Sequence, residues 1–214
     1  MMSPGFWREL AFIETPFCQT CGIPFASPAL AGALCASCLE TAPHFDSARS
    51  AVVYNDASRK VILDFKYGDR LHAVKTFAPW LQRAGAELIA QSDIFIPVPL
   101  HRKRLWQRRF NQSAVIAREL SLRTGIKCLS YGLRRMRHTV PQKGLTRKDR
   151  HANVKNAFYI DAAAMSDIQG KAVLLIDDVY TTGATLNECA RTLKKNGAAR
   201  VMVLTIARVT RDEF

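Results

Sequence analysis

Apolar residues are spaced along this chain as expected for alternating strands and helices. Short apolar runs typical of buried strands occur at residues 51–54, 94–99, 128–134, 156–160, 173–176 and 200–208. Between these runs, helical spacing is found at residues 57–65, 71–90 and 111–124, and again from the turn after residue 180 to about residue 195. Pro79 indicates an interruption in the second helical segment, because proline lacks the N–H of a helix interior. The alternation predicts an α/β protein with a parallel sheet flanked by helices.

The first 45 residues follow a different pattern. They are rich in Cys, Pro and Ala and have weak periodicity, which is typical of a small module that does not build a core of its own. Pro43-His44 marks the expected boundary. The 214 residues therefore divide into a small module at residues 1–45 and a domain of catalytic size at residues 46–214.

Two cysteine pairs lie within this module. Cys18-x-x-Cys21 and Cys35-x-x-Cys38 are separated by thirteen residues, which is the pattern of a structural zinc ribbon with four thiolate ligands. Gly22 follows the first pair, where a tight turn needs a permissive backbone. The spacing favours Zn²⁺, while an iron–sulfur cluster and two disulfides stay open as alternatives.

The strand at residues 173–176 leads into a polar turn. Asp177 and Asp178 follow it, at the carboxyl end of the predicted strand, where open α/β sheets bind their ligands. The next helix then begins with hydroxyl groups and glycine, and its N-terminus is a site for anions. The residues of this loop are Thr181, Thr182, Gly183, Ala184 and Thr185. We interpret the segment as a cradle for a phosphate and a ribose, the alternative being a polar strand end before a hydroxyl-capped helix.

Residues 173–185 resemble the signature of the type I phosphoribosyltransferases, which bind 5-phosphoribosyl-1-pyrophosphate (PRPP). The resemblance implies that Asp177 and Asp178 hold the ribose 2′- and 3′-hydroxyls. It also implies that residues 181–185 wrap the 5′-phosphate. Mg²⁺ is expected to bind together with PRPP, because it prefers oxygen ligands such as a diphosphate and a nearby carboxylate.

Charge is the third informative feature of the chain. It has 31 Lys and Arg against 18 Asp and Glu, a formal net charge of +13, and most of the excess lies between residues 101 and 155. A pyrophosphate substrate, a nucleic acid or a solvated basic surface would each explain this excess. A pyrophosphate needs few cations, so the surplus favours a nucleic acid as a further partner. Trp106 lies among these arginines, either packed beneath its loop or available to stack on a base.

The chain as a whole resembles the ComF family of competence-associated proteins, which join an N-terminal zinc finger to a phosphoribosyltransferase domain. The resemblance covers nearly the whole chain. It rests on the four cysteines, Phe65-Lys66-Tyr67-Gly68, Pro97-Val98-Pro99, Arg109-Phe110-Asn111-Gln112, Gln142, Leu145, Arg150, Asn153, Ala157-Phe158 and residues 173–185. It implies the type I phosphoribosyltransferase fold with a small zinc-ribbon module.

Two loops acquire roles from this resemblance. The loop after Pro97-Val98-Pro99 corresponds to the pyrophosphate loop, so Arg104, Arg108 or Arg109 is expected to neutralise the leaving group. The long polar segment at residues 134–155 corresponds to a flap that closes over the reacting centre. Its matched residues are Gln142, Arg150 and Asn153. An exposed basic loop that binds a partner is the alternative for this segment.

Arg109 departs from the family pattern, which has glycine at this place. If the position requires a positive φ, an arginine there is strained. Phe65-Lys66-Tyr67-Gly68 is expected either in a hood over the acceptor site or as a helix end with a glycine cap.

Three functions are consistent with the sequence. The ComF resemblance implies that the protein binds PRPP and takes part in natural transformation, in the uptake or processing of single-stranded DNA, with a helicase-like partner. The alternatives are an active phosphoribosyltransferase with an unknown nitrogen acceptor, and a regulator that senses PRPP without turnover. Apolar stretches are too short to cross a bilayer, and Arg8, Glu9 and Glu14 interrupt any signal-peptide region. We therefore expect a cytoplasmic protein with two buried free thiols, Cys128 and Cys189.

Overall fold

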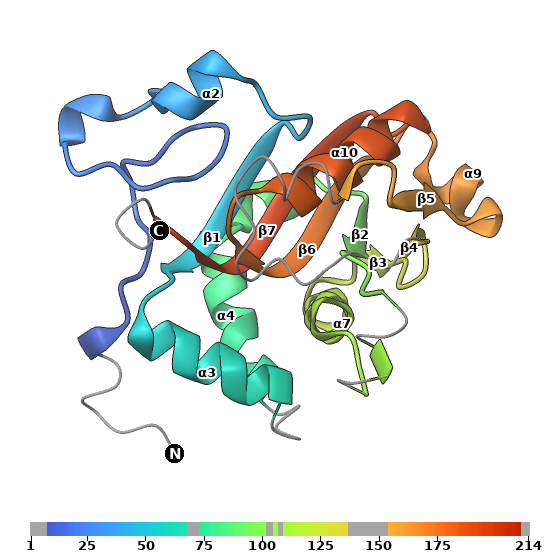
Figure 1. Ribbon diagram of the computed structural model, residues 1–214, viewed down its shortest axis with the longest axis horizontal. Helices are drawn as coiled ribbons and strands as arrows, with labels where there is room; N and C mark the ends of the chain where they lie inside the picture. Colours follow the sequence, from blue (N-terminus) through green and yellow to red (C-terminus); the bar gives the residue numbers. More distant parts are fainter. Residues whose placement is uncertain (1–7, 68–72, 102–104, 107–108, 137–153, 211–214) are drawn as a thin grey trace.

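The computed structural model describes residues 8–67, 73–101, 105–106, 109–136 and 154–210 (Figure 1). Its strands are β1 (Ser47–Val53), β2 (Ile94–Pro97), β3 (Lys127–Cys128), β4 (Leu133–Arg135), β5 (Phe158–Ile160), β6 (Ala172–Tyr180) and β7 (Arg200–Arg208). The longer helices are α3 (Asp56–Tyr67), α4 (Val74–Ala84), α7 (Gln112–Thr124) and α10 (Ala184–Lys195). Shorter helical turns are η1 (Pro28–Leu30), α2 (Ala36–Glu40), α5 (Ala86–Ala90), η3 (Ala162–Ala164) and α9 (Met165–Ile168).

The predicted parallel sheet is confirmed. Its five strands are ordered β1-β7-β6-β2-β3 and every neighbouring pair is parallel. From β6 the chain crosses through α10 to β7, and from β2 it crosses through α7 to β3 on the other side. The order of the strands therefore reverses between β6 and β2, which is the place where such sheets form a ligand crevice.

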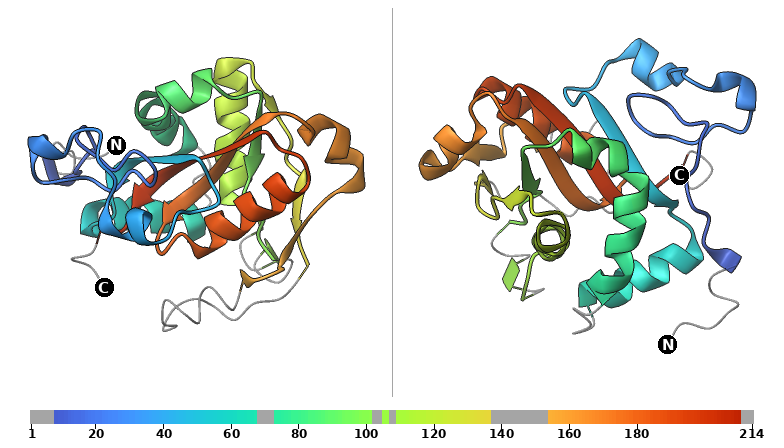
Figure 2. Two further views of the ribbon diagram at one scale, coloured as in Figure 1. Left: turned by 90° about the horizontal axis from the view of Figure 1, so that it is seen from above. Right: turned by 180° about the vertical axis from the view of Figure 1, so that it is seen from behind.

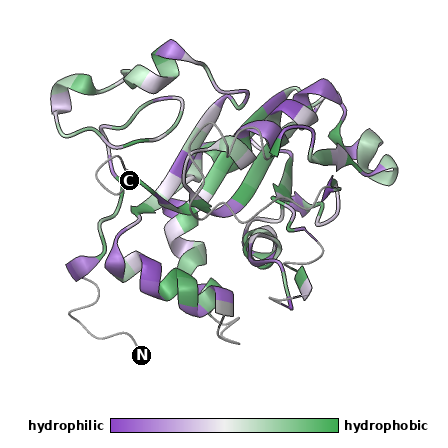
Figure 3. Cartoon of the chain, viewed as in Figure 1, coloured by the Kyte–Doolittle hydropathy of each residue, from purple (hydrophilic) through white to green (hydrophobic). Residues whose placement is uncertain are grey.

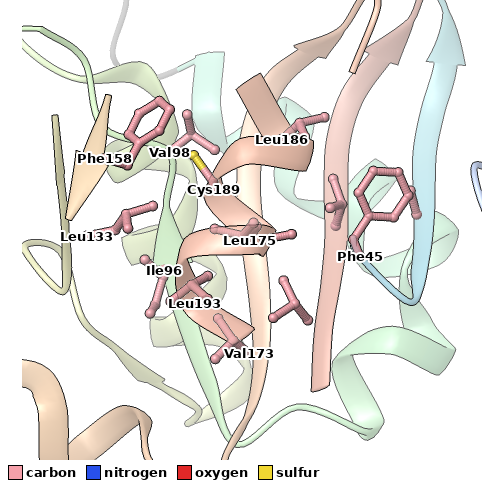
Figure 4. Packing of buried hydrophobic residues seen from close by; sticks show 14 of the residues in the cluster. Phe45, Ile96, Val98, Leu133, Phe158, Val173, Leu175, Leu186, Cys189 and Leu193 are labelled. Atoms are coloured by element: carbon pink, nitrogen blue, oxygen red, sulfur yellow. The ribbon is translucent and has the colours of Figure 1, made fainter. Parts of the chain in front are cut away.

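Alternate residues of the central strands face opposite layers of helices. Val173 and Leu175 pack beneath α10, where Figure 4 shows them with Leu193. Leu174 and Ile176 belong to the core that is formed with α3, α4 and α7. Figure 2 shows α10 on one side of the sheet with α4 and α7 on the other, and Figure 3 shows the apolar character of β6 and β7. A strand that is buried on both faces reads as a continuous apolar run, as residues 173–176 do.

Several predicted boundaries were wrong. Pro79 lies inside α4 and does not interrupt it, because buried Phe77 and Leu81 hold the helix against the core. The break comes at Gly85, where a Cβ atom would lie 2.7 Å from the side chain of Leu204. The expected strand at residues 128–134 is divided between β3 and β4, and β6 continues past residue 176 to Tyr180. Burial of Cys189 is confirmed, whereas Cys128 on the edge strand β3 is half-buried.

The cysteine-containing segment lies against the edge of the sheet at β1. The Phe12 backbone forms an isolated antiparallel bridge with Val52, and Ala48 N donates to Thr20 O at 2.7 Å. Phe45 packs in the same apolar cluster as the inner face of α10. The domain boundary at residue 45 stays a prediction.

Candidate functional site

The two acids lie where β6 passes the end of β2. Val98 N donates to Ile176 O at 2.9 Å, and the pairing of β2 with β6 ends there. Strand β6 continues past this point and stays paired with β7, with Asp177 opposite Thr205. Both carboxylates therefore lie at the switch point of the sheet, at the ligand edge that the sequence predicts.

The loop after the acids ends in a helix N-terminus without a side-chain cap. Gly183 is the N-cap of α10 and has a φ of 78°, a conformation that favours glycine. No side chain caps the first turn of α10, and its helical hydrogen bonding begins with Asn187 N donating to Gly183 O at 2.8 Å. The first N–H groups of α10 therefore keep their capacity to bind an anion.

Asp177 is held in an environment that opposes its charge. Its Oδ1 accepts from Ser113 Oγ at 2.8 Å and from Asp178 N at 2.9 Å. Burial, followed by the charge of Asp178, raises the pKa of Asp177 to about 7. The site thus holds a carboxyl group that ionises near neutral pH, where a cation or a hydroxyl donor stabilises its charged form.

Asp178 is paired with a lysine from a distant part of the chain. Its Oδ2 lies 2.8 Å from Lys66 Nζ, and both side chains are 15% exposed. Lys66 lies near the end of α3, and its backbone oxygen accepts from Gln112 Nε2 at 3.4 Å. This pair places one cation directly beside the two acids.

These groups surround one cavity of about 190 Å³. It is lined by Lys66, Val98, Pro99, Leu100, Gln112, Ser113, Arg135, Asp177, Asp178, Val179, Thr181, Gly183, Ala184, Thr185 and Leu186. Of the predicted cradle residues, Thr182 is the one that does not line it. Thr182 instead borders a larger cleft toward the cysteine cluster, and its buried Oγ1 makes no hydrogen bond within the described part of the chain.

The four cysteines of the N-terminal pairs converge. The sulfurs of Cys18, Cys21, Cys35 and Cys38 lie within 4.8 Å of one another, and none forms a disulfide. Burial raises the pKa of Cys21 to about 11 and that of Cys38 further. Burial also opposes ionisation of Cys18, but nearby backbone N–H groups lower its pKa to about 7. Four converging sulfurs, two of them on buried thiols whose raised pKa opposes ionisation without a cation, fit a structural Zn²⁺.

The turn between Cys18 and Cys21 is built against β1. Gly22 has a φ of 69°, and Gly22 N donates to Cys18 O at 2.8 Å. A Cβ atom on Gly22 would lie 2.4 Å from Ala48 O, so a side chain does not fit there. The sequence therefore places glycine where both the backbone conformation and the close approach require it.

Comparison with known proteins agrees with this arrangement. The family model described as the phosphoribosyl transferase domain matches residues 113–213, which contain β6, α10 and β7. Competence protein F from Haemophilus influenzae is 33% identical over 198 residues, which are 90% of this chain and 85% of that protein. This chain belongs to the ComF family.

Other relatives have names that refer to DNA or competence. DNA utilization protein YhgH from Salmonella typhimurium is 32% identical, covering 89% of this chain and 83% of that protein. Competence protein ComFC from Bacillus subtilis is 26% identical, covering 75% of this chain and 63% of that protein. Among solved structures, a glutamine PRPP amidotransferase from B. subtilis is 19% identical with a TM-score of 0.42, over 67% of this chain and 30% of that chain. Because that TM-score is low, the phosphoribosyltransferase fold rests on the strand order and the family match.

Three of the segments that this chain shares with the ComF pattern, those around Phe65, Val98 and Asn111, meet at the site. Asn111 caps α7 by accepting from Ser113 N at 3.1 Å, and its Nδ2 donates to Val98 O at 3.1 Å. The rings of Phe65 and Phe110 lie 6.1 Å apart between their centroids. The segment around Phe110 thus positions Ser113 for Asp177 and supports the end of α3 that carries Lys66.

Arg109 has a φ of 63°, so its position does require the left-handed conformation in which the ComF pattern has glycine. Its side chain is exposed. Arg104 and Arg108, the other predicted pyrophosphate residues, lie outside the described residues. The matched flap residues Gln142, Arg150 and Asn153 also lie outside them.

The ends of the flap segment are described. Strands β4 and β5 form an antiparallel pair, with Arg135 opposite Phe158, and Met136 N donates to Ala157 O at 2.9 Å. Arg135 lines the small cavity, and its guanidinium lies 5.3 Å from the centre of the Phe158 ring. The flap segment thus leaves and rejoins the fold beside the site.

Sequence reasoning does not identify four residues as neighbours of the predicted site residues: Lys66, Ser113, Arg135 and Arg208. Lys66 belongs to the Phe65-Lys66-Tyr67-Gly68 motif and Ser113 follows Arg109-Phe110-Asn111-Gln112, but no spacing rule joins them to acids so far along the chain. Arg135 lies in the polar segment at residues 134–155. Arg208 ends a predicted strand, and its burial beside the cysteines depends on the tertiary fold.

No helix within the described ranges is long and apolar enough to cross a membrane.

Proposed function

We propose that this ComF-family protein binds PRPP with Mg²⁺ in the cavity between the acid pair and the start of α10. One observation carries the proposal: two carboxylates and a helix N-terminus without a side-chain cap face the same cavity of about 190 Å³. Asp177 and Asp178 would accept hydrogen bonds from the ribose hydroxyls. Residues 181–185 would surround the 5′-phosphate through their N–H groups and hydroxyls.

The same geometry supports a transferase reaction. A nitrogen nucleophile would form a bond to C1 of the ribose as the C1–O bond to pyrophosphate breaks, and pyrophosphate would leave with the electron pair. Mg²⁺ bound with the substrate would supply positive charge that offsets the charge of the pyrophosphate. The chain itself orients the ribose through the acid pair and offers Lys66 and Arg135 as cations beside it. Its contribution would be positioning and electrostatic stabilisation.

Calorimetric titration with Mg²⁺ and PRPP tests the binding site. The double variant Asp177→Ala/Asp178→Ala should bind at least tenfold more weakly, because two charge-assisted hydrogen bonds are worth roughly 1.5 to 3 kcal/mol each. Asp167→Ala is the matched control, since Asp167 is a half-exposed acid on α9 that pairs with Lys127. Equal affinities for the wild type and the double variant would place the ligand elsewhere.

Pyrophosphate release distinguishes an enzyme from a sensor. The wild type is incubated with PRPP, Mg²⁺ and candidate bases, amines or single-stranded DNA. Release that depends on an acceptor and is lost in the double variant would support transfer. PRPP binding without release for any acceptor would favour a regulator that senses PRPP.

We also propose a role in natural transformation through single-stranded DNA. The names of the relatives refer to competence and DNA utilization, and the chain carries a net charge of +13. Trp106 is 89% exposed, and Gln107 separates it in the chain from Arg108 and Arg109, a sequence that suits stacking on a base near a phosphate contact. A helicase-like partner stays a prediction of the family resemblance.

Fluorescence anisotropy with a labelled single strand tests this role. Affinity should fall by roughly 0.7 log units per phosphate contact for each log unit of salt. Trp106→Ala should weaken binding by about 1 to 3 kcal/mol if the ring stacks on a base. Leu122→Ala is the control, because Leu122 is an apolar side chain 76% exposed on α7. A Trp106 variant that binds like the wild type would remove the stacking role, and absence of binding at low salt would remove the DNA role.

We propose that one Zn²⁺ ion binds the four cysteines. The support is the convergence of their sulfurs within 4.8 Å. Elemental analysis of protein that has been purified without chelator should find one zinc per chain. Absence of both zinc and iron would contradict a metal site, and iron would identify a cluster in place of zinc.

A further inference from the structure

A buried arginine joins the cysteine cluster to the strand that carries the acids. Arg208 is the last residue of β7, and its Cα pairs in register with that of Tyr180. Its Nη1 donates to Cys21 O at 2.8 Å, and its Nη2 donates to Cys21 Sγ at 3.3 Å. The guanidinium carbon lies 3.9 Å from the centre of the Tyr180 ring. Arg208 thus contacts a metal-binding residue and the last residue of β6 at the same time.

The Tyr180 ring in turn packs against the phosphate loop, residues 181–185. Tyr180 is 7% exposed, and a Cβ atom on Gly183 would lie 2.7 Å from its ring. The Phe45 ring packs edge-on against the Tyr180 ring, with the two ring centroids 6.1 Å apart. Because the N-cap of α10 rests directly on this ring, a shift of Tyr180 would move the start of the helix that binds the anion.

Elsewhere the cysteine module and the phosphate loop are separated by a cleft of about 1070 Å³. Phe25, Leu30 and Leu34 border it on one side, and residues 181–183 border it on the other. The described links across it are the Arg208–Tyr180 contact, the Phe45 ring and a hydrogen bond from His44 N to the side chain of Asn187. Of these, the Arg208 link contacts a metal-binding residue directly.

Geometry gives this link its dependence on the metal. Two buried guanidinium groups, those of Arg49 and Arg208, lie beside the cluster. A bound ion would fix the four sulfurs, and with them Cys21, whose O and Sγ atoms accept from Arg208. Without the ion these two acceptors are no longer held in place, and a buried guanidinium that loses its acceptors is strongly unfavourable, so the side chain would move toward water.

We propose that Arg208 is a positioning residue that couples metal binding at the cysteine cluster to PRPP binding at the phosphate loop. In the metal-loaded protein the fixed Cys21 holds Arg208 over Tyr180, and Tyr180 supports Gly183. Loss of the metal frees the Arg208 side chain from the Tyr180 ring, and the phosphate loop then becomes less ordered. The coupling rests on the proposed binding of PRPP, and by linkage PRPP must strengthen metal retention by the same factor as the metal strengthens PRPP binding.

Calorimetry on four samples tests the coupling: wild type and Arg208→Gln, each zinc-loaded and each stripped with chelator under reducing conditions. Zinc removal from the wild type should weaken Mg²⁺-PRPP binding by about tenfold, which is typical of two coupled sites. Arg208→Gln with zinc bound should show a similar loss, and stripping it should add little, because both changes break one link.

Arg49→Gln is the matched control. Arg49 is also buried beside the cluster, but it donates to Gln19 O and Ala48 O and lies over the Phe17 ring, with no described contact to the phosphate loop. In the zinc-loaded state Arg49→Gln should therefore bind PRPP as the wild type does, even if it holds zinc less firmly.

Zinc transfer to a chromophoric chelator provides a readout that needs no variant. Saturating Mg²⁺-PRPP should slow zinc release from the wild type several-fold. The coupling is overturned if zinc-loaded and stripped wild type bind PRPP equally and PRPP does not change zinc release. Failure of the wild type to bind PRPP in any state would instead overturn the proposed function.

Discussion

Asp177→Asn should make the protein more stable above neutral pH while weakening ligand binding. The pKa of Asp177 is raised from 3.8 to about 7, so the folded protein holds this proton more tightly than the unfolded chain. The unfolding free energy therefore falls as pH rises from about 4 to about 7, and it stays lower above that range. At 1.36 kcal/mol per pKa unit, the full shift corresponds to about 4 kcal/mol. Asparagine abolishes this loss because it does not ionise.

The substitution also has a cost that does not depend on pH. Asparagine keeps the oxygen that accepts from Ser113 and from Asp178 N, but it adds an NH₂ group that needs an acceptor. An NH₂ group without one lowers the unfolding free energy by about 1 kcal/mol. The two effects should nearly cancel at pH 4.5, and the variant should gain about 2 to 3 kcal/mol at pH 8.

Denaturant unfolding at a series of pH values measures this difference. Asp167→Asn serves as a control at a half-exposed acid and should stay within about 0.5 kcal/mol of the wild type. Parallel curves for Asp177→Asn and the wild type across the range would refute the reasoning, since they would show that Asp177 ionises in the folded state as it does in the unfolded chain. The same variant should bind Mg²⁺-PRPP more weakly, which is the usual conflict between stability and function at such sites.

Three further predictions concern stability and are measured by denaturant unfolding. Arg109→Gly should raise the unfolding free energy by about 0.5 to 1 kcal/mol, because φ is 63° there, and a loss of stability would contradict the strain. Gly22→Ala should cost about 2 kcal/mol or more, since its Cβ would lie 2.4 Å from a backbone oxygen of β1, whereas Gly125→Ala, with open space, should cost about 1. Lys66→Met should cost about 2 kcal/mol by leaving a largely buried carboxylate without its cation, and exposed Lys60→Met on the same helix should cost little.

The parts of the site that could be predicted are those that are contiguous in the chain. Residues 173–185 contain, in this order, a buried strand, two acids and a loop of small and hydroxyl residues. In the fold they lie at the edge of the parallel sheet where the sequence predicts a ligand. The paired cysteines likewise have a spacing that predicts convergence. In both cases local sequence alone determines which atoms come together.

The rest depends on which surfaces the fold brings together. Lys66 reaches Asp178 because α3 and α7 cover the same face of the sheet, a placement that helical periodicity does not specify. Arg208 is buried because β7 ends between the cysteine cluster and Tyr180, although an arginine at a strand end is most often exposed. Pro79 is tolerated within α4 because tertiary packing outweighs local propensity.

The arrangement of charge distinguishes between the two proposed partners. Two carboxylates repel a phosphate, so a site for phosphate alone gains nothing from Asp177 and Asp178. They favour a ligand that places neutral hydroxyl donors on the acids and an anion at the start of α10, whose N-cap Gly183 follows Asp178 by five residues. A ribose 5-phosphate group with both hydroxyls free has that order, whereas DNA lacks the 2′-hydroxyl. The Asp177→Ala/Asp178→Ala protein should therefore lose PRPP binding and keep its affinity for single-stranded DNA. Loss of both together would mean that the two ligands share this cavity.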